Sequence, residues 1–247
     1  FNNLDEFFQL SKESDISHEY TIAWVDCLAS GSKIGRGIFK RANHSQKRAL
    51  TQSISREISF PISLPFSLVN KTSLKIFNAV YRWKSSRKEG YNVENIIPFF
   101  YPLDSIQNWN RIYGQRGFLQ YQCVIPMKHA KSVLGEILER ISISGQGSFL
   151  TVLKMFGEIQ SPGMLSFPRA GATLALDFPN KGEKLFKLLY ELDQLVISSG
   201  GAIYPAKDAR MSSEAFCSAF SKSKEFSDFI DPVFSSSFWR RVIETEV

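Results

Sequence analysis

The succession of elements between residues 117 and 204 constrains the fold of this chain more than any other feature. A β-rich stretch at 117–125 precedes a helical pattern at about 129–143, and two further β-rich stretches follow near 149–156 and 172–178. A second helical pattern ends at Gly200 and Gly201, as a helix C-cap does, and a short strand then reaches Tyr204. The order β-α-β-β-α-β is that of the split βαβ, or ferredoxin-like, unit. We therefore predict an α+β fold in which an antiparallel sheet carries both helices on one face.

The strand at 117–125 indicates what the two faces of this sheet hold. Its odd-numbered positions from 119 to 125 are apolar, whereas Gln120 and Gln122 occupy even-numbered positions. Since side chains alternate along a strand, both amides lie on the face opposite the helices. Two interpretations stay open at this point. The amides face water, or the uncovered face binds something polar.

For two lysines, too, the sequence leaves open whether the side chain faces water or binds a polar ligand. Lys154 shares a strand face with Leu150, Val152 and Phe156, where an ammonium is costly unless it meets an anion, a dipole or a polar ligand. The alternative is a lysine whose stem covers apolar surface while its charge reaches water at the sheet edge. Lys207 follows the last strand, in a loop of the kind that often carries chemistry, although an isolated lysine there is usually a surface residue.

Composition limits the classes of function. The chain has 247 residues, 43% of them hydrophobic and 22% charged, which is typical of one large globular domain or two small ones. Its net charge of +6 permits an anionic ligand, but the basic residues are dispersed and do not favour nucleic acid. Three cysteines and three histidines lie far apart, so neither a disulfide framework, a metal site nor a histidine triad is expected.

Cellular context follows from the same evidence. The cysteine pattern favours a reducing compartment, so we expect a cytoplasmic protein, with membrane association left open. The sequence has neither a signal peptide nor a run of about 18 apolar residues. The chain begins at Phe1 rather than at a methionine, and we expect it to be the middle of a longer protein.

The first third of the sequence predicts smaller elements. We expect a helix to about Glu13 and a strand over 20–26, and we interpret the following glycines at 31, 35 and 37 as a hairpin connection. Their spacing fits neither a dinucleotide fingerprint nor a P-loop. An amphipathic helix carries Leu74, Phe77, Val80 and Tyr81 and is closed by a basic run at 82–88. That run is either a solvated helix end or a mobile loop that touches a phosphate or a lipid surface.

Several segments together resemble a known family. The segments are YTIAWVD at 20–26, GRG at 35–37, PLD at 102–104, WNRIYG at 109–114, GFLQYQCVIP at 117–126, FLTVLKMFG at 149–157, LDFP at 176–179 and YPAKD at 204–208. In this order they are similar to the decaprenylphosphoryl-β-D-ribose oxidase branch of the FAD-linked oxidases (vanillyl-alcohol oxidase superfamily). The similarity covers nearly the whole chain.

The resemblance implies a domain organisation. Residues 1–202 would form a substrate-binding cap domain, and residues 203–247 would return to an FAD-binding domain. The glycine-rich segment that holds the FAD pyrophosphate in this family is not in the sequence, so we expect that the chain alone does not retain flavin. The implied chemistry is hydride transfer from a sugar carbinol carbon to FAD, which yields a ketone.

The resemblance also implies the site residues. Lys207 would be catalytic, next to the flavin and the reacting hydroxyl, and Tyr204 would join it in contacting the cofactor. The substrate-binding residues would be Gln120, Gln122, Lys154, Tyr204, Arg111, Leu150 and Phe156, with the last two as apolar walls. The partners implied by the resemblance are a small-molecule or lipid-linked sugar substrate and a reductase that completes an epimerisation. Peripheral contact with a membrane surface is left open by the basic run at 82–88, and composition leads us to expect no nucleic acid.

The chain departs from the family at one point. Thr173 and Ala175 stand where the mycobacterial-type enzymes carry Asn and Cys, which changes a pocket contact and leaves the exact sugar open. Two alternatives to the oxidoreductase remain: a ferredoxin-like binding module and a flavin-less relic without catalysis. An RNA-binding sheet is disfavoured, because no aromatic pair occupies the exposed face of the strands.

Overall fold

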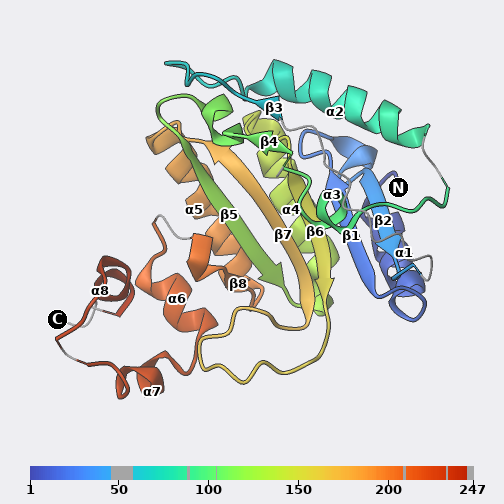
Figure 1. The fold of residues 1–247 in the computed structure, drawn as a ribbon. Helices are drawn as coiled ribbons and strands as arrows, with labels where there is room; N and C mark the ends of the chain where they lie inside the picture. The colour runs from blue at the N-terminus through green and yellow to red at the C-terminus, as the bar shows by residue number, and fades with distance from the viewer. Residues whose placement is uncertain (46–57, 88–89, 104, 208–209, 232, 244–247) are drawn as a thin grey trace.

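A six-stranded antiparallel sheet forms the centre of the computed structural model, which describes residues 1–45, 58–87, 90–103, 105–207, 210–231 and 233–243 (Figure 1). The strand order is β2-β1-β6-β7-β5-β8, and every neighbouring pair is antiparallel. The strands are β1 (Tyr20–Val25), β2 (Gly37–Ala42), β5 (Phe118–Ile125), β6 (Thr151–Phe156), β7 (Gly171–Pro179) and β8 (Ala202–Ile203). The predicted α+β class with an antiparallel sheet is confirmed.

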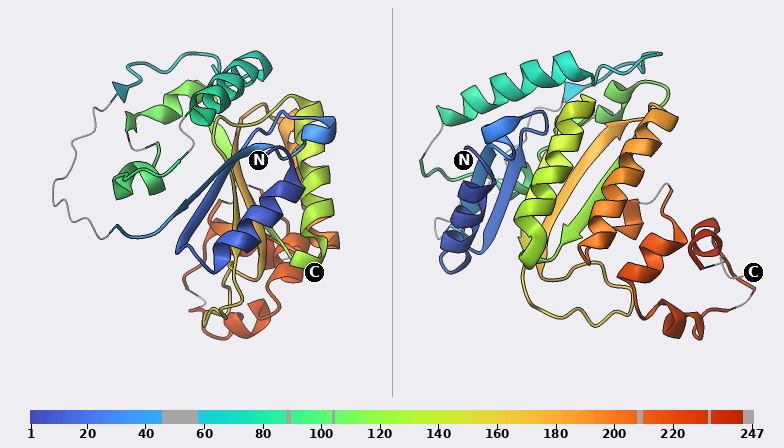
Figure 2. Two further views of the ribbon diagram at one scale, coloured as in Figure 1. Left: turned by 90° about the vertical axis from the view of Figure 1, so that its right-hand side faces the viewer. Right: turned by 180° about the vertical axis from the view of Figure 1, so that it is seen from behind.

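Helices α1 (Leu4–Asp15), α4 (Met127–Ser144) and α5 (Glu183–Ser198) lie on one face of this sheet, as the view from behind shows (Figure 2). The core forms there, because the apolar positions of β5 and β7 point toward the helices. Ile125 and Leu174 of the sheet are fully buried together with Leu134 of α4 and Leu192 of α5. Helix α5 ends at Ser198, and the positive φ of Gly200 turns the chain back toward β8.

The pairing register decides which side chains share the opposite face. Gln120 of β5 lies opposite Asp177 of β7, and Gln122 lies opposite Ala175. On the other side of β7, Lys154 of β6 lies opposite Thr173. Paired residues of an antiparallel sheet point to the same side, so these polar groups all lie away from α4 and α5. The expectation from alternation is therefore confirmed for both amides.

The connection between β1 and β2 is a hairpin, as the glycines predicted. It contains the 3-10 turn η1 (Gly31–Lys33), and Gly31 and Gly35 both have positive φ angles. Asp26, at the end of β1, fixes the loop, because its carboxylate accepts hydrogen bonds from Arg36 at 2.6 Å and from Asn78 at 2.6 Å. The second bond joins the hairpin to helix α2 (Lys71–Ser86).

Helix α2 crosses one end of the sheet and is separate from α1, α4 and α5, the three helices that cover the core (Figure 1). Tyr81 packs edge-on against Trp24 of β1, with ring centroids 4.9 Å apart, and Phe77 packs against Phe149. The helix continues to Ser86, so most of the basic run lies within it. The remaining segments before β5 are β3 (Ile58–Ser59), which pairs in parallel with β4 (Ile106–Gln107), α3 (Ile96–Phe100) and the 3-10 helix η2 (Trp109–Tyr113).

After β8 the chain forms the 3-10 turn η3 (Pro205–Lys207), α6 (Ser213–Ala219), α7 (Ser223–Ser227) and α8 (Ser237–Ile243). Phe216 of α6 is buried and contacts the rings of Phe238 and Trp239 on α8. In the part of the chain that the structure describes, no helix is long and apolar enough to cross a bilayer.

Candidate functional site

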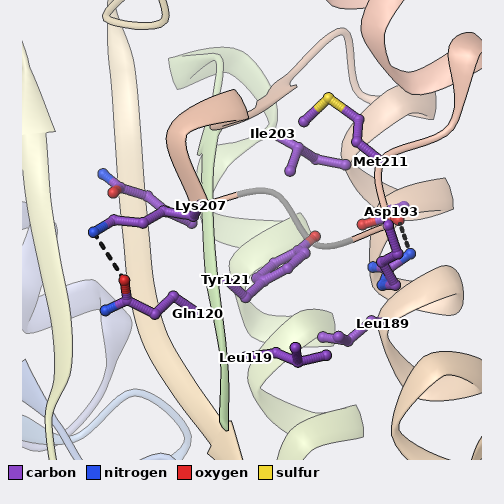
Figure 3. Close-up of a pocket in the computed structure, with 10 residues that line it drawn as sticks. Leu119, Gln120, Tyr121, Leu189, Asp193, Ile203, Lys207 and Met211 are labelled. Carbon is purple, nitrogen blue, oxygen red and sulfur yellow. Dashed lines mark hydrogen bonds and ion pairs between the residues drawn. The ribbon is translucent and has the colours of Figure 1, made fainter. Parts of the chain in front are cut away.

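A row of polar side chains crosses the uncovered face where β7, β5 and η3 meet. The ammonium of Lys207 donates a hydrogen bond to Oε1 of Gln120, with 3.1 Å between the two atoms (Figure 3). The side chain of Gln120 also lies beside the carboxyl of Asp177, its cross-strand neighbour, and helps to lower the pKa of that carboxyl. The row thus joins three elements that are distant in the sequence.

Strand β8 is what brings Lys207 to this row. It pairs with β5 over only two residues, and the backbone N–H of Tyr204 then donates to the carbonyl of Gln122 at 2.9 Å. Pro205 cannot extend the ladder, because it has no N–H, and the chain turns over the sheet in η3. The backbone N–H of Lys207 closes this turn by donating to the carbonyl of Tyr204 at 3.1 Å.

Asp177 belongs to the site, although the sequence patterns assign it no role. It is only 7% exposed, and burial raises the pKa of its carboxyl to about 6. Hydrogen bonds from Gln120 and Tyr113 and the charge of Lys207 act in the opposite direction, because each stabilises the carboxylate. A signal for it exists in the sequence, since it is the one charged residue in the strand β7.

A second polar group lies further along the same strands. Nε2 of Gln122 donates to Oγ1 of Thr173 at 3.2 Å, and Thr173 is paired with Lys154. The head of Lys154 is exposed, yet the sheet around it removes part of its hydration and lowers the pKa of its ammonium. The structure thus places Gln120, Gln122, Lys154 and Lys207 on one face.

Aromatic residues border this group. The ring of Tyr204 stacks on Phe167, with centroids 4.5 Å apart, and Phe156 meets Phe167 edge-on at 6.1 Å. Phe167, which is 4% exposed, was not singled out from the sequence. Leu150 lies just before β6 and is half-buried. Phe156 and Tyr204 therefore come together through a residue of the long β6–β7 connection.

Arg111 lies apart from the polar row. It belongs to η2, and its Nη1 donates to the carbonyl oxygens of Phe60 and Pro61 at 2.7 and 2.8 Å. These bonds attach η2 to the segment that follows β3. A substrate contact of Arg111 stays a prediction.

One cavity adjoins the polar row, and another lies elsewhere on the sheet. A small one, of about 30 Å³, lies between β5 and α5, where Arg210 pairs with Asp193 at 2.7 Å beside Tyr121 (Figure 3). A larger one, of about 520 Å³, lies over β1 and β2. Its lining includes Tyr20, Lys40, Tyr81, Lys84, Phe99 and Phe100.

The chemistry of this face suits a polar ligand. The row offers an ammonium, an amide and a carboxyl group, and the second polar group adds the amide of Gln122, so that together they both donate and accept hydrogen bonds. Within the described residues, no group of three or more His, Cys, Asp or Glu side chains could hold a metal ion.

Comparison with known proteins identifies relatives. No family model matches the chain. It is 32% identical over 256 residues to the decaprenylphosphoryl-beta-D-ribose oxidase of Mycolicibacterium smegmatis, an alignment that covers 97% of this chain and 55% of that protein. It is 28% identical over 261 residues to an uncharacterized protein in the mprA 5' region of Streptomyces coelicolor, covering 97% of this chain and 70% of the other. The chain thus spans about half the length of the oxidase. Over nearly all of its own length, this chain is a relative of decaprenylphosphoryl-beta-D-ribose oxidase.

Proposed function

We propose that this chain is the substrate-binding and C-terminal part of an FAD-dependent oxidoreductase that oxidises a sugar or polyol hydroxyl to a ketone. The observation that carries the proposal is the row formed by Lys207, Gln120 and Asp177 on a sheet face that α4 and α5 leave uncovered. Similarity to an oxidase along 97% of the chain supports it.

The architecture supports a cap-like role. The unit β5-α4-β6-β7-α5-β8 has the strand order β8-β5-β7-β6, for which we propose the ferredoxin-like, split βαβ assignment. In the proposed division, residues 1–202 are the cap domain and residues 203–247 lead back to the FAD-binding domain. Lys207 and Tyr204 stand directly after the proposed boundary, where the two domains would meet.

The donor set at this face fits the polar edge of a flavin ring. Lys207 offers a cation to an anionic reduced flavin, and the half-buried ring of Tyr204 offers a planar neighbour. These two residues would hold FAD from the side of this chain, and the rest of the cofactor would be bound outside it. When bound, FAD supplies the hydride acceptor for the oxidation.

The residues of the chain would then bind and orient the sugar. The Lys207 ammonium would donate to the oxygen of the reacting hydroxyl and stabilise negative charge electrostatically, without covalent chemistry. Gln120, Gln122 and Lys154 would hold the remaining hydroxyls, with Thr173 fixing the amide of Gln122. Leu150 and Phe156 would form apolar walls that keep water from the reacting carbon.

The substrate we propose is a sugar linked to a polyprenyl phosphate or a related polyol. The cavity of about 520 Å³ supports an apolar extension, because aromatic rings and the cations Lys40 and Lys84 line it together. A reductase that acts on the ketone product, and so completes an epimerisation, is the proposed protein partner.

The test uses the full-length protein. We expect a yellow preparation with flavin absorbance that bleaches anaerobically when polyprenyl-phosphoryl-ribose is added. Lys207→Ala should retain FAD but lose reduction, whereas Lys187→Ala, at an exposed position of α5, should behave as the wild type. A colourless full-length protein that takes up no FAD would contradict the proposal and favour a binding module. Unchanged reduction kinetics in Lys207→Ala would remove this residue from its role.

A further inference from the structure

Helix α2 carries more positive charge than the proposed site uses, since Lys84 is its one cation among the residues that line the cavity over β1 and β2. Between residues 71 and 87 the sequence contains five basic residues and no acidic one. The basic residues are Lys71, Lys75, Arg82, Lys84 and Arg87. Arg82 points toward the N-terminus, where it donates to Asn2 at 3.0 Å. In the described part of the chain, no carboxylate forms an ion pair with any of the five.

The inner side of α2 is firmly attached, which fixes the rotation of the helix. Leu74 is fully buried, and Asn78, 2% exposed, donates to the Asp26 carboxylate at 2.6 Å. Tyr81 rests against Trp24. Because 3.6 residues make one turn, positions 76, 80 and 83 lie on the side opposite these contacts.

That outer side is apolar. Ile76 is 62% exposed, Val80 54% and Trp83 56%, and together they form a stripe along the axis of α2. Val80, which the amphipathic pattern grouped with Leu74, points outward instead. The segment that leads into the helix adds the exposed side chains of Ile62 and Phe66.

Cations flank this stripe. The guanidinium of Arg87 lies over the ring of Trp83, 3.8 Å from its centroid, at the C-terminal end of the helix. Lys75 and Lys84 are both exposed and lie on either side of the stripe. Tryptophan and arginine or lysine around an apolar stripe are the composition of helices that lie in a membrane interface.

We propose that the outer face of α2 docks this protein on an anionic lipid bilayer, with Ile76, Val80 and Trp83 inserted among the acyl chains and Lys75, Lys84 and Arg87 on the headgroups. Charge favours this occupant over a second copy of the chain, because two copies would bring the same cations together. The inference goes beyond the proposed function and does not depend on flavin binding. It explains why so much apolar surface is exposed on a helix whose other side is well packed.

The test is flotation of the full-length protein with vesicles. We expect binding to phosphatidylcholine vesicles that contain phosphatidylglycerol, and binding at least about tenfold weaker to phosphatidylcholine alone. Lys75→Glu combined with Lys84→Glu should weaken binding to the anionic vesicles by about tenfold or more. The matched control, Lys184→Glu with Lys187→Glu on α5, makes the same charge change on another helix and should have a much smaller effect.

Insertion of the α2 side chains among the acyl chains is tested separately from the electrostatic attraction of α2 to the headgroups. Lipids brominated on their acyl chains should quench the tryptophan fluorescence of the wild type, and the quenching should disappear in Trp83→Phe. Ile76→Ser should weaken binding, whereas Ile159→Ser, at a position 94% exposed in the β6–β7 connection, should not. Equal binding to both kinds of vesicle, or unchanged quenching in Trp83→Phe, would overturn the proposal. So would protection of Trp83 from a water-soluble quencher in the vesicle-free protein, because another part of the protein would then cover α2.

Discussion

The ammonium of Lys207 and the amide oxygen of Gln120, 3.1 Å apart, join the turn after β8 to the middle of β5. The amide of Gln120 also faces its cross-strand neighbour Asp177, whose pKa it lowers and whose carboxylate can only accept a hydrogen bond. Gln120 is therefore oriented with its oxygen toward Lys207 and its nitrogen toward Asp177. A charged lysine and a buried carboxyl group are coupled through one neutral side chain.

This coupling predicts the behaviour of Gln120→Leu. The variant removes a donor that stabilises the Asp177 carboxylate, so the pKa of Asp177 should rise above its wild-type value of about 6. The carboxyl carbon of Asp177, followed by NMR during a pH titration, reports this pKa directly. Gln122→Leu is the matched control, since Gln122 contacts Thr173 and not Asp177. Equal pKa values in the wild type and Gln120→Leu would show that the two side chains are not coupled.

Asp177→Asn should change how stability depends on pH. The pKa of Asp177 is higher in the folded protein than its ordinary value of 3.8, so folding favours the protonated acid. The contribution of Asp177 to the free energy of unfolding is fully present below about pH 4 and is lost as pH rises through about 6. The stability of the wild type relative to Asp177→Asn should therefore fall by about 2–3 kcal/mol between pH 4 and pH 7. Urea unfolding of both proteins at several pH values measures this difference.

The control for that measurement is Glu158→Gln, which changes an exposed acid just after β6. Its stability relative to the wild type should hardly vary over the same pH range. If Asp177→Asn behaves in the same way, the carboxyl of Asp177 is hydrated in solution.

The sequence predicts the parts of this site that depend on a single strand, but not the parts that depend on how distant strands pair. Alternation within one strand was enough to place Gln120 and Gln122 on the uncovered face. The position of Lys207 over Gln120, 87 positions away in the sequence, needs the pairing of β8 with β5. Asp177 gained its role only through the register with Gln120, which no single-strand pattern specifies.

For helix α2, the sequence likewise predicts the helix but not which of its sides packs inward. Its spacing predicted an amphipathic helix, but Leu74, Phe77, Val80 and Tyr81 do not share one environment. Which side of α2 faces inward is decided by Trp24 of β1 and by Phe149 just before β6, and Val80 lies away from both. The helix also extends through most of the basic run, because Lys, Arg and Trp side chains are compatible with a helix.

The buried ion pair beside the site should matter for stability. Asp193 of α5 is 4% exposed and accepts a hydrogen bond from Arg210 at 2.7 Å. Asp193→Ala should lower the free energy of unfolding by about 3 kcal/mol, because it leaves a partly buried guanidinium without this carboxylate. Chemical denaturation measures the loss. Glu191→Ala, which removes a more exposed acid from the same helix, should cost less than about 1 kcal/mol, and equal losses in the two variants would contradict the expectation.

Thiol reactivity tests both the core and the uncovered face. Burial raises the pKa of Cys27 to about 11 and of Cys123 to about 12, whereas Cys217 is exposed. A thiol reagent should therefore label one cysteine per native chain, and Cys217→Ser should abolish that labelling.

The uncovered face is tested in the Cys217→Ser background. There Ala175→Cys should restore labelling, since Ala175 lies half-buried on the uncovered face opposite Gln122. Leu174→Cys, one residue earlier and fully buried toward the helices, is the control that should stay unlabelled. Labelling at both positions would mean that β7 does not present the two faces described above, and labelling at neither would mean that the face at Ala175 is covered in the native protein.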